Sequence, residues 1–439
     1  MAQPAARQGL LRSLRTRDLT AVVINGVIGA GIFGLPSRVF ALSGDYSLLA
    51  FFVCAICVAI IVASFAEVAS RFSETGGPYL YARVAFGPGA AFAVGWLLWV
   101  ARVSAFAANC SLLAEYLALF VPAFSAGPAR AVLVAGIVAA LTLLNIRGIR
   151  PVATASNVLA VGKLVPLFGF AIVGLFFLHS QQFDFRQPPE YRSFALSVLL
   201  LVFAFTGFEM GMVPAGESTD PKRNLPTALL SGMAVVIVLY VLVQVVCIGT
   251  LPGLAASKRP LADAAGAFLG PWGAAVMAFG LVLSLAGNLN VIVLSASRTL
   301  FAMGEQGDLP ASLARLHPSY RTPVAAVLWT TAAMLALTLS GTYVYLVTVS
   351  TLSRLAAYLA TCGAMPVFRR RADAPSALFR TPGGVPMAML GVLVCLWLFS
   401  SSTWREARDT LLAAGLGFVL FAGTRWWATR GEVEPRRGS

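Results

Sequence analysis

The fold is decided by residues 24–36, which read Ile24-Asn25-Gly26-Val27-Ile28-Gly29-Ala30-Gly31-Ile32-Phe33-Gly34-Leu35-Pro36. In this first long apolar segment, four glycines and a proline fall within eleven residues. Each glycine costs a helix about 1 kcal/mol relative to alanine, so a helix that only crosses a bilayer has no use for them. In lipid, irregular backbone persists only where protein buries it or where it lines a cavity. We therefore predict a break at residues 28–33 that exposes amides and carbonyls to a small polar ligand near the midplane.

The composition predicts a membrane protein with many spans. The chain has 439 residues, of which 58% are hydrophobic and 11% charged, and its mean hydropathy is +0.82. Apolar runs of about twenty residues recur along the whole length, and each is long enough to cross the hydrocarbon core. This leaves no room for a separate soluble domain. The polar, basic N-terminus and the long first apolar run argue against a cleavable signal peptide.

We predict about twelve membrane spans, with ends set to within about two to four residues. Their ranges are 20–41, 47–70, 90–120, 129–146, 155–178, 193–215, 226–251, 271–302, 323–341, 343–367, 385–402 and 408–427. The basic residues gather in both tails and in alternate loops, so the net charge of +14 follows the positive-inside rule and does not indicate nucleic-acid binding. We therefore expect a multi-pass protein of the cytoplasmic (inner) membrane with both termini in the cytoplasm.

A second interrupted segment occurs five spans later. It reads Phe203-Ala204-Phe205-Thr206-Gly207-Phe208-Glu209-Met210-Gly211 and is followed by Pro214. Interrupted segments at matching positions in two halves of a transporter indicate an inverted repeat with a binding site between them. The predicted fold is therefore all-α, with a five-plus-five inverted repeat and two extra C-terminal helices. Its predicted parts are a tail (1–17), a first repeat (18–178), a second repeat (192–368), two extra spans (385–427) and a C-terminal tail (428–439).

Five motifs occur in order along nearly the whole chain. They are Gly29-Ala30-Gly31-Ile32-Phe33, Glu74-Thr75-Gly76-Gly77-Pro78-Tyr79-Leu80-Tyr81, Phe205-Thr206-Gly207-Phe208-Glu209, Glu217-Ser218-Thr219-Asp220-Pro221-Lys222-Arg223-Asn224-Leu225-Pro226, and Ala296-Ser297-Arg298-Thr299-Leu300-Phe301-Ala302-Met303 with Gly307-Asp308-Leu309-Pro310. Together they resemble the motifs of the amino acid–polyamine–organocation (APC) superfamily, which implies an amino-acid permease of LeuT-like fold. The resemblance is specific for the superfamily and not for a substrate.

The resemblance implies a substrate site built largely from backbone. The residues implied are Val27, Ile28, Ala30, Gly31, Ile32, Phe203, Phe205 and Thr206. The amides at 30–32 are expected to meet an amino acid's carboxylate, because they open the second half-helix at its positive dipole end. Carbonyls at the end of the first half and in the sixth span are expected to meet the amino group. The alternative is that the glycines only permit close helix packing.

The resemblance also implies gates on the two sides of the site. Phe203 is expected to close over the substrate from outside, and plain packing is the alternative. Arg298 and Arg354 are expected to form ion pairs at an inner gate. For Arg298, snorkelling of the side chain to the lipid headgroups is an equally good interpretation.

Lys163 and Glu209 are ionisable residues inside predicted spans, where a charge costs at least a few kcal/mol unless it is neutralised or paired. Lys163 matches a lysine whose ammonium replaces a sodium ion in proton-coupled members, so its proton is the candidate coupling ion. A static charge that pins the first span to the fifth is the alternative. Glu209 is a candidate for proton coupling, for a structural hydrogen-bond hub at the break, or for substrate contact.

Other polar residues in the spans are interpreted mainly as structural. Glu67 and Arg71 are four residues apart in a favourable helical order. Arg102 is expected to face the core, in a cation–π or carboxylate pair, with a role in side-chain selectivity as the alternative. Asn288 and Asn290 are expected to form hydrogen bonds between helices. The six cysteines fall in apolar runs and are predicted to be buried free thiols.

The sequence therefore predicts an alternating-access permease, with small-molecule amino acids or amines as its substrates and a proton as its coupling ion. The alternative of the same fold is an exchanger of amino acids, or of an amino acid for an amine. A membrane enzyme would need clustered ligands or a nucleophile–base set, and the two histidines are peripheral. Two broken helices fit alternating access better than they fit the continuous pore of a channel. Apart from the lipid bilayer, the sequence indicates no macromolecular partner, metal or other cofactor, and it does not indicate the oligomeric state.

Overall fold

The computed structural model describes residues 10–118, 121–340, 343–400 and 404–431. The α-helices are α1 (Thr16–Val27), α2 (Gly31–Ser43), α3 (Ser47–Ala69), α4 (Pro78–Phe86), α5 (Pro88–Ala118), α6 (Gly127–Ile146), α7 (Ile149–Gly174), α8 (Tyr191–Phe205), α9 (Pro221–Thr250), α10 (Pro260–Glu305), α11 (Val324–Ser340), α12 (Tyr343–Arg370), α13 (Gly384–Ser400) and α14 (Trp404–Gly431). Short 3₁₀ turns join them, including η5 (Phe208–Met212) and η6 (Ala215–Glu217). Within the described residues the only extended pairing is an isolated bridge between Leu14 and Ser218. The all-helical prediction is confirmed for this part of the chain.

Within the residues that the structure describes, six helical segments are long and apolar enough to cross a membrane. They are Gly31–Ala69, Pro88–Ala118, Gly127–Ile146, Ile149–Phe177, Pro221–Thr250 and Pro260–Glu305. Four shorter apolar helices accompany them, at Tyr191–Val202, Val324–Ser340, Gly384–Ser400 and Thr410–Val419. The chain is therefore a multi-pass membrane protein, while the number of about twelve crossings stays a prediction.

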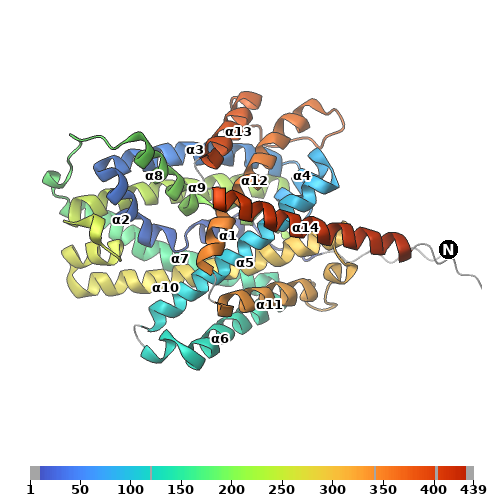
Figure 1. Cartoon of the computed structure of the whole chain (residues 1–439), viewed down its shortest axis with the longest axis horizontal. Helices are drawn as coiled ribbons and strands as arrows, with labels where there is room; N and C mark the ends of the chain where they lie inside the picture. Colours follow the sequence, from blue (N-terminus) through green and yellow to red (C-terminus); the bar gives the residue numbers. More distant parts are fainter. Residues whose placement is uncertain (1–9, 119–120, 341–342, 401–403, 432–439) are drawn as a thin grey trace, which may run out of the picture.

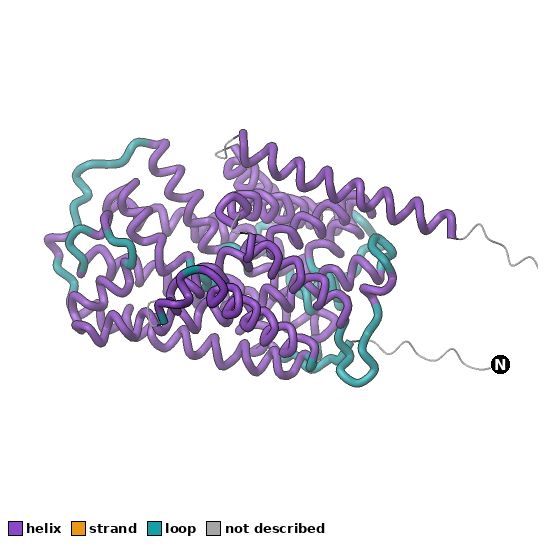
Figure 2. The backbone as a smooth tube through the Cα atoms, turned by 60° about the horizontal axis from the view of Figure 1, so that its bottom comes forward, coloured by secondary structure: helices purple, strands orange, loops and turns teal. Residues whose placement is uncertain are grey.

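The helices are arranged around α1, α5 and α10. The long helix α10 runs along most of the molecule and packs against α5 and α7 (Figure 1). Helix α1 lies inside, against α7, α9 and η5. In contrast, α6 is at the periphery beside α11, and only Val134, Val138 and Asn145 of it are buried. Most loops gather at the two ends of the long axis, and the start of the described chain lies at the same end as the terminus of α14 (Figure 2).

Two local features differ from the ranges expected from the sequence. The Gly-Gly-Pro-Tyr segment lies outside the predicted spans but leads directly into helix α4, because Pro78 occupies a first helical position and Gly77 precedes it with a φ of 55°. Helix α10 begins eleven residues before the predicted span 271–302, at Pro260, and bends at Gly270, whose φ is 66°. The part after the bend is the predicted span.

Candidate functional site

The glycine-rich stretch at residues 24–36 contains the junction between α1 and α2. Helix α1 ends at Val27, Ile28 is extended with ψ of 92°, and α2 begins at Gly31 with Ala30 as its N-cap. Ala30 and Gly31 are half-buried, whereas Val27, Ile28 and Ile32 are buried. The first amides of any helix have no acceptor within it, and they form its positive end. The junction therefore offers backbone donors at a reachable position.

Helix α8 ends in a second junction that touches the first. It ends at Phe205, and Gly207 adopts a left-handed φ of 108° before η5 begins. A Cβ added to Gly26 would lie 2.5 Å from the carbonyl oxygen of Gly207, and a Cβ on Gly207 would clash with the carbonyl of Gly26. The two backbones therefore cross in direct contact, and only glycine fits at either position.

The side chains around this crossing come from α8 and α9. The hydroxyl of Tyr240 donates to the carbonyls of Ala204, at 3.2 Å, and Val27, at 3.5 Å. The ring of Phe205 packs on that of Tyr240 with centroids 4.9 Å apart, and Thr206 is buried next to it. Tyr240 thus joins the C-terminal ends of α1 and α8, a role that sequence reasoning missed. The side chain of Phe203 lies outside the described residues, so its predicted gating role stays a prediction.

Lys163 on α7 reaches the first junction. Its Nζ donates to the carbonyl of Ile28 at 2.6 Å and to that of Ser284, on α10, at 3.2 Å. The hydroxyl of Ser284 in turn donates to the carbonyls of Ile28, at 3.0 Å, and Gly29, at 3.2 Å. The side chain of Lys163 is fully buried, and among the described residues no carboxylate lies within ion-pair distance of it. Among the described residues, carbonyl groups are the hydrogen-bond partners that hold this ammonium group.

Asparagines hold the end of α1 against α10. Asn288 donates to the carbonyls of Asn25, at 2.8 Å, and Gly26, at 2.9 Å, and accepts from Asn109 at 2.7 Å. Asn290 donates to the carbonyl of Val152 at 3.3 Å. The prediction that Asn288 and Asn290 form hydrogen bonds between helices is confirmed. Asn109, which is half-buried, was missed, although an amide in an apolar run signals such a partner.

Glu209 lies at the centre of a buried polar cluster at the second junction. It accepts from Arg354 at 3.3 Å, from the hydroxyl of Tyr358 at 2.6 Å and from the amide of Gly207 at 3.0 Å. The rings of Phe208 and Tyr358 stack, with centroids 4.9 Å apart. The cluster therefore braces the left-handed turn at Gly207 from the side of α12.

Comparison with known proteins places this arrangement in a family. The model of the amino acid permease family matches residues 14–411, which include both junctions and all the helices named above up to the start of α14. The chain belongs to the amino acid permease family. Its relatives are transporters and permeases, and the chain is not an enzyme.

Three relatives illustrate the range of the family around this permease. It is 28% identical to the methylthioribose transporter of Bacillus subtilis (strain 168), over 94% of this chain and 94% of the relative. It is 27% identical to a branched-chain amino acid permease of the same organism, over 96% and 94% of the two chains. It is 31% identical to an arginine/ornithine antiporter of Pseudomonas aeruginosa, over 73% and 69%.

Arg298 of the permease forms a buried ion pair close to the N-terminal segment that precedes α1. Its Nε and Nη2 bind the two carboxylate oxygens of Glu217 at 3.3 and 3.1 Å, and both side chains are buried. The carbonyl of Glu217 accepts from the amides of Ser13 and Leu14. The snorkelling interpretation of Arg298 is therefore wrong, because its charge is neutralised by Glu217 inside the protein and not by headgroups. This pair could not be seen in the sequence, since its members are 81 residues apart.

Arg102 of the permease is buried without an ion pair among the described residues. Its Nη1 donates to the hydroxyl of Thr299 at 2.5 Å, while its Nε and Nη2 have no hydrogen-bond partner there. The expected carboxylate or cation–π partner is absent from the contacts found for this side chain in the described part. The core-facing position was predicted correctly, but the partner was not.

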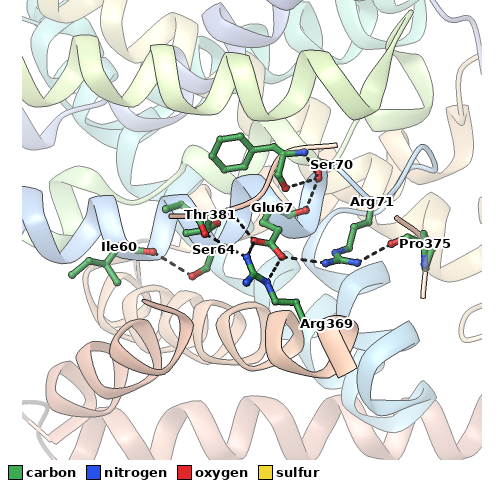
Figure 3. Close-up of polar contacts among 10 residues, drawn as sticks. Ile60, Ser64, Glu67, Ser70, Arg71, Arg369, Pro375 and Thr381 are labelled. Carbon is green, nitrogen blue, oxygen red and sulfur yellow. Dashed lines mark hydrogen bonds and ion pairs between the residues drawn. The ribbon is translucent and has the colours of Figure 1, made fainter. Parts of the chain in front are cut away.

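Glu67 forms a clasp at the end of α3, which Figure 3 shows in detail. Its carboxylate accepts from Arg71 at 3.1 Å, from Arg369 at 2.8 and 2.6 Å, and from the amide of Thr381 at 2.8 Å. Arg71 also donates to the carbonyl of Pro375 at 2.8 Å. The structural interpretation of Glu67 and Arg71 holds, and the clasp extends it to α12 and to the segment that follows it.

Proposed function

We propose that the chain is a secondary active transporter that carries an amino acid across the cytoplasmic membrane by alternating access, with a proton as the coupling ion. The crossing of two interrupted helices carries this proposal. It brings the unsatisfied amides of α2 next to the carbonyl ends of α1 and α8, so donors for a carboxylate and acceptors for an ammonium group share one site. We include in the proposal an inverted repeat of 18–178 and 192–368, with 385–427 outside it and the tails 1–17 and 428–439 in the cytoplasm.

In the proposed site, the substrate is held mainly by backbone. Its carboxylate takes the amides of Ala30, Gly31 and Ile32, and its amino group takes the carbonyls of Val27 and Thr206. The half-buried position of Ala30 and Gly31 within an otherwise buried stretch supports this assignment. A backbone site recognises the part that all α-amino acids share, so the choice of side chain rests on other residues. No metal or further cofactor belongs to the proposal.

The proposed coupling group is Lys163. Its ammonium ties α7 to the end of α1 and to α10 through the carbonyls of Ile28 and Ser284. A neutral amine binds two carbonyls less strongly, because the charge-assisted part of both hydrogen bonds is lost. Gain and loss of this proton would therefore tighten and loosen α1 against its neighbours. For Glu209, the contacts with Arg354 and Tyr358 support a role as a structural hydrogen-bond hub. We assign Arg298 and Arg354 to ion pairs of an inner gate.

The test of symport is uptake by the purified protein in liposomes. With an imposed inward proton gradient, we expect faster uptake and transient accumulation, both abolished by a protonophore. An exchanger of the same fold is the second candidate, and the similarity to an arginine/ornithine antiporter favours it. An exchanger would take up substrate only into liposomes loaded with a counter-substrate, whatever the proton gradient. That result would reject symport.

The substrate class is tested by thermal unfolding of the purified protein against single compounds. A ligand that binds the folded state raises its stability, and above Kd the increase grows with the logarithm of the ligand concentration. We expect stabilisation by one or a few amino acids, and the compounds tested should include amines and methylthioribose, the named substrate of one relative. Stabilisation by methylthioribose with none by any amino acid would reject the amino-acid site.

A further inference from the structure

Two adjoining cavities lie between α1 and α7, and neither belongs to the substrate site. The first has a volume of about 500 Å³ and lies at the N-terminal ends of both helices. Its charged and amide lining consists of Arg12, Arg15, Arg17, Asp18, Arg150 and Asn157. All four arginines are exposed. Four guanidinium groups around one opening make a strongly cationic surface.

Asp18, the one acid in this lining, is already engaged. Its carboxylate accepts from the amide of Arg15 at 2.9 Å and from Asn157 at 2.7 Å, and it lies 3.7 Å from the Nε of Arg17. It therefore offsets part of the charge of Arg17 and leaves the other guanidinium groups for a ligand. Arginines in this arrangement suit a phosphate group, whose several oxygens accept hydrogen bonds from planar donors.

The second cavity continues from the first into the membrane region. It has a volume of about 900 Å³ and shares Arg17, Thr154 and Asn157 with the basic cavity. Beyond them and the hydroxyls of Thr16 and Thr20, its walls are apolar and include Ala21, Ile24, Val158, Val161 and Leu164. From Thr154 to Leu164 a helix rises about 15 Å, which is half of the ~30 Å hydrocarbon core. The groove thus matches the depth of one leaflet.

We propose that the two cavities form one site for an anionic phospholipid of the leaflet on the N-terminal side. Its phosphate lies among Arg12, Arg15, Arg17 and Arg150, and one acyl chain lies in the groove between α1 and α7. The continuity of the apolar groove with the basic cavity favours a lipid over a soluble anion. The excess of guanidinium groups favours an anionic over a zwitterionic headgroup, since the cationic part of the latter would meet only the engaged Asp18.

Such a lipid would add to the contact between α1 and α7. Directly, these helices are joined by Asp18 with Asn157, by Asn25 with the carbonyl of Ser156 at 2.7 Å, and by Lys163 with Ile28. A lipid in the groove covers the side of α1 that these bonds leave open. We therefore expect bound lipid to stabilise the folded protein whether or not it transports anything, which makes the test independent of the proposed function.

The experiment measures retention of phosphatidylglycerol and phosphatidylcholine by native mass spectrometry of the purified full chain. The variant carries Arg15→Gln, Arg17→Gln and Arg150→Gln, and the control carries Arg315→Gln, Arg370→Gln and Arg380→Gln, three exposed arginines outside the cavity. Each basic residue near an anionic headgroup contributes about a factor of five in affinity. We expect phosphatidylglycerol to bind the cavity variant about tenfold or more weakly, and the control unchanged.

A second pair of variants tests the groove without changing charge. Val161→Trp fills the groove and should weaken phosphatidylglycerol binding, whereas Val165→Trp, exposed on the same helix outside the groove, should not. The proposal would be overturned if the cavity variant and its control retained phosphatidylglycerol equally. It would also be overturned if the unmodified protein bound phosphatidylcholine as strongly as phosphatidylglycerol. Full affinity of Val161→Trp for phosphatidylglycerol would also overturn the proposal. So would binding of glycerol phosphate as strong as that of the lipid, because either result would show that no acyl chain occupies the groove.

Discussion

The two helix junctions hold buried charge in opposite ways. At the first, the ammonium of Lys163 is surrounded by the carbonyls of Ile28 and Ser284. At the second, Glu209 is matched by the opposite charge of Arg354. Removal of the proton from Lys163 leaves no uncompensated partner behind, whereas neutralisation of Glu209 would strand a buried guanidinium group. The first junction is suited to a change of protonation and the second to a fixed geometry.

The largest effect is expected where the two junctions touch. Gly207→Ala places a Cβ against the backbone of Gly26 at a φ of 108°, so neither junction can keep its position. We expect a loss of at least about 4 kcal/mol in the free energy of unfolding, measured by thermal or chemical denaturation, and no transport. Gly169→Ala is the control, because open space surrounds Gly169 on α7, and it should be neutral or slightly stabilising. Normal stability of Gly207→Ala would show that the crossing is not tight.

The next effect tests the fixed charge of the second junction. Glu209→Gln removes the partner of Arg354, and we expect a loss of about 3–5 kcal/mol in stability. The double variant Glu209→Gln with Arg354→Gln strands no charge and should recover a substantial part of that loss. If the double variant is less stable than the single one, the pair does not act as a charge-compensated unit, and the contrast between the junctions fails.

A smaller stability effect with a large functional one is expected at the first junction. Lys163→Met removes a buried charge, and the carbonyl of Ile28 keeps the hydroxyl of Ser284, so stability should change by less than about 2 kcal/mol. Uptake in liposomes should no longer respond to an imposed proton gradient. Leu167→Met, one turn away and buried, is the control and should keep that response. Proton-driven uptake by Lys163→Met would remove Lys163 from the coupling role.

The smallest effect concerns the link between the junctions. Tyr240→Phe deletes the hydroxyl that donates to Ala204 and Val27, which should cost about 1 kcal/mol of stability and weaken substrate binding by less than tenfold. Tyr46→Phe deletes a comparable bond, to the carbonyl of Phe185, far from the crossing. It should leave substrate affinity, measured by ligand-dependent unfolding, unchanged. Equal affinities in both variants would show that the Tyr240 hydroxyl does not organise the site.

The sequence is informative about backbone and much less so about partners. Glycine in a lipid-embedded helix is unfavourable, so the run at residues 24–36 can be interpreted locally, and so can a lone Lys163 in an apolar run. The partners of Arg298 and Arg102 could not be predicted, because helices buried on most sides have weak apolar periodicity and do not reveal which face meets which neighbour. Tyr240 was missed for the same reason. Ser284 was missed because a serine hydroxyl in a span is usually satisfied by its own helix.

The Glu67 clasp limits how the outer helices can move. Helix α12 and the segment up to Thr381 are tied to the end of α3 by three donors on one buried carboxylate, two from Arg369 and one from the amide of Thr381. Separating α12 from α3 at that end would leave the carboxylate without the guanidinium group of Arg369, which is costly inside a protein. Toward its N-terminal end, α12 is held by Arg354, which donates to the buried carboxylate of Glu209 at 3.3 Å. Because Glu67 and Glu209 hold α12 at two levels along its length, the least costly displacement of this helix is one in which α3 and the second junction move with it as one unit.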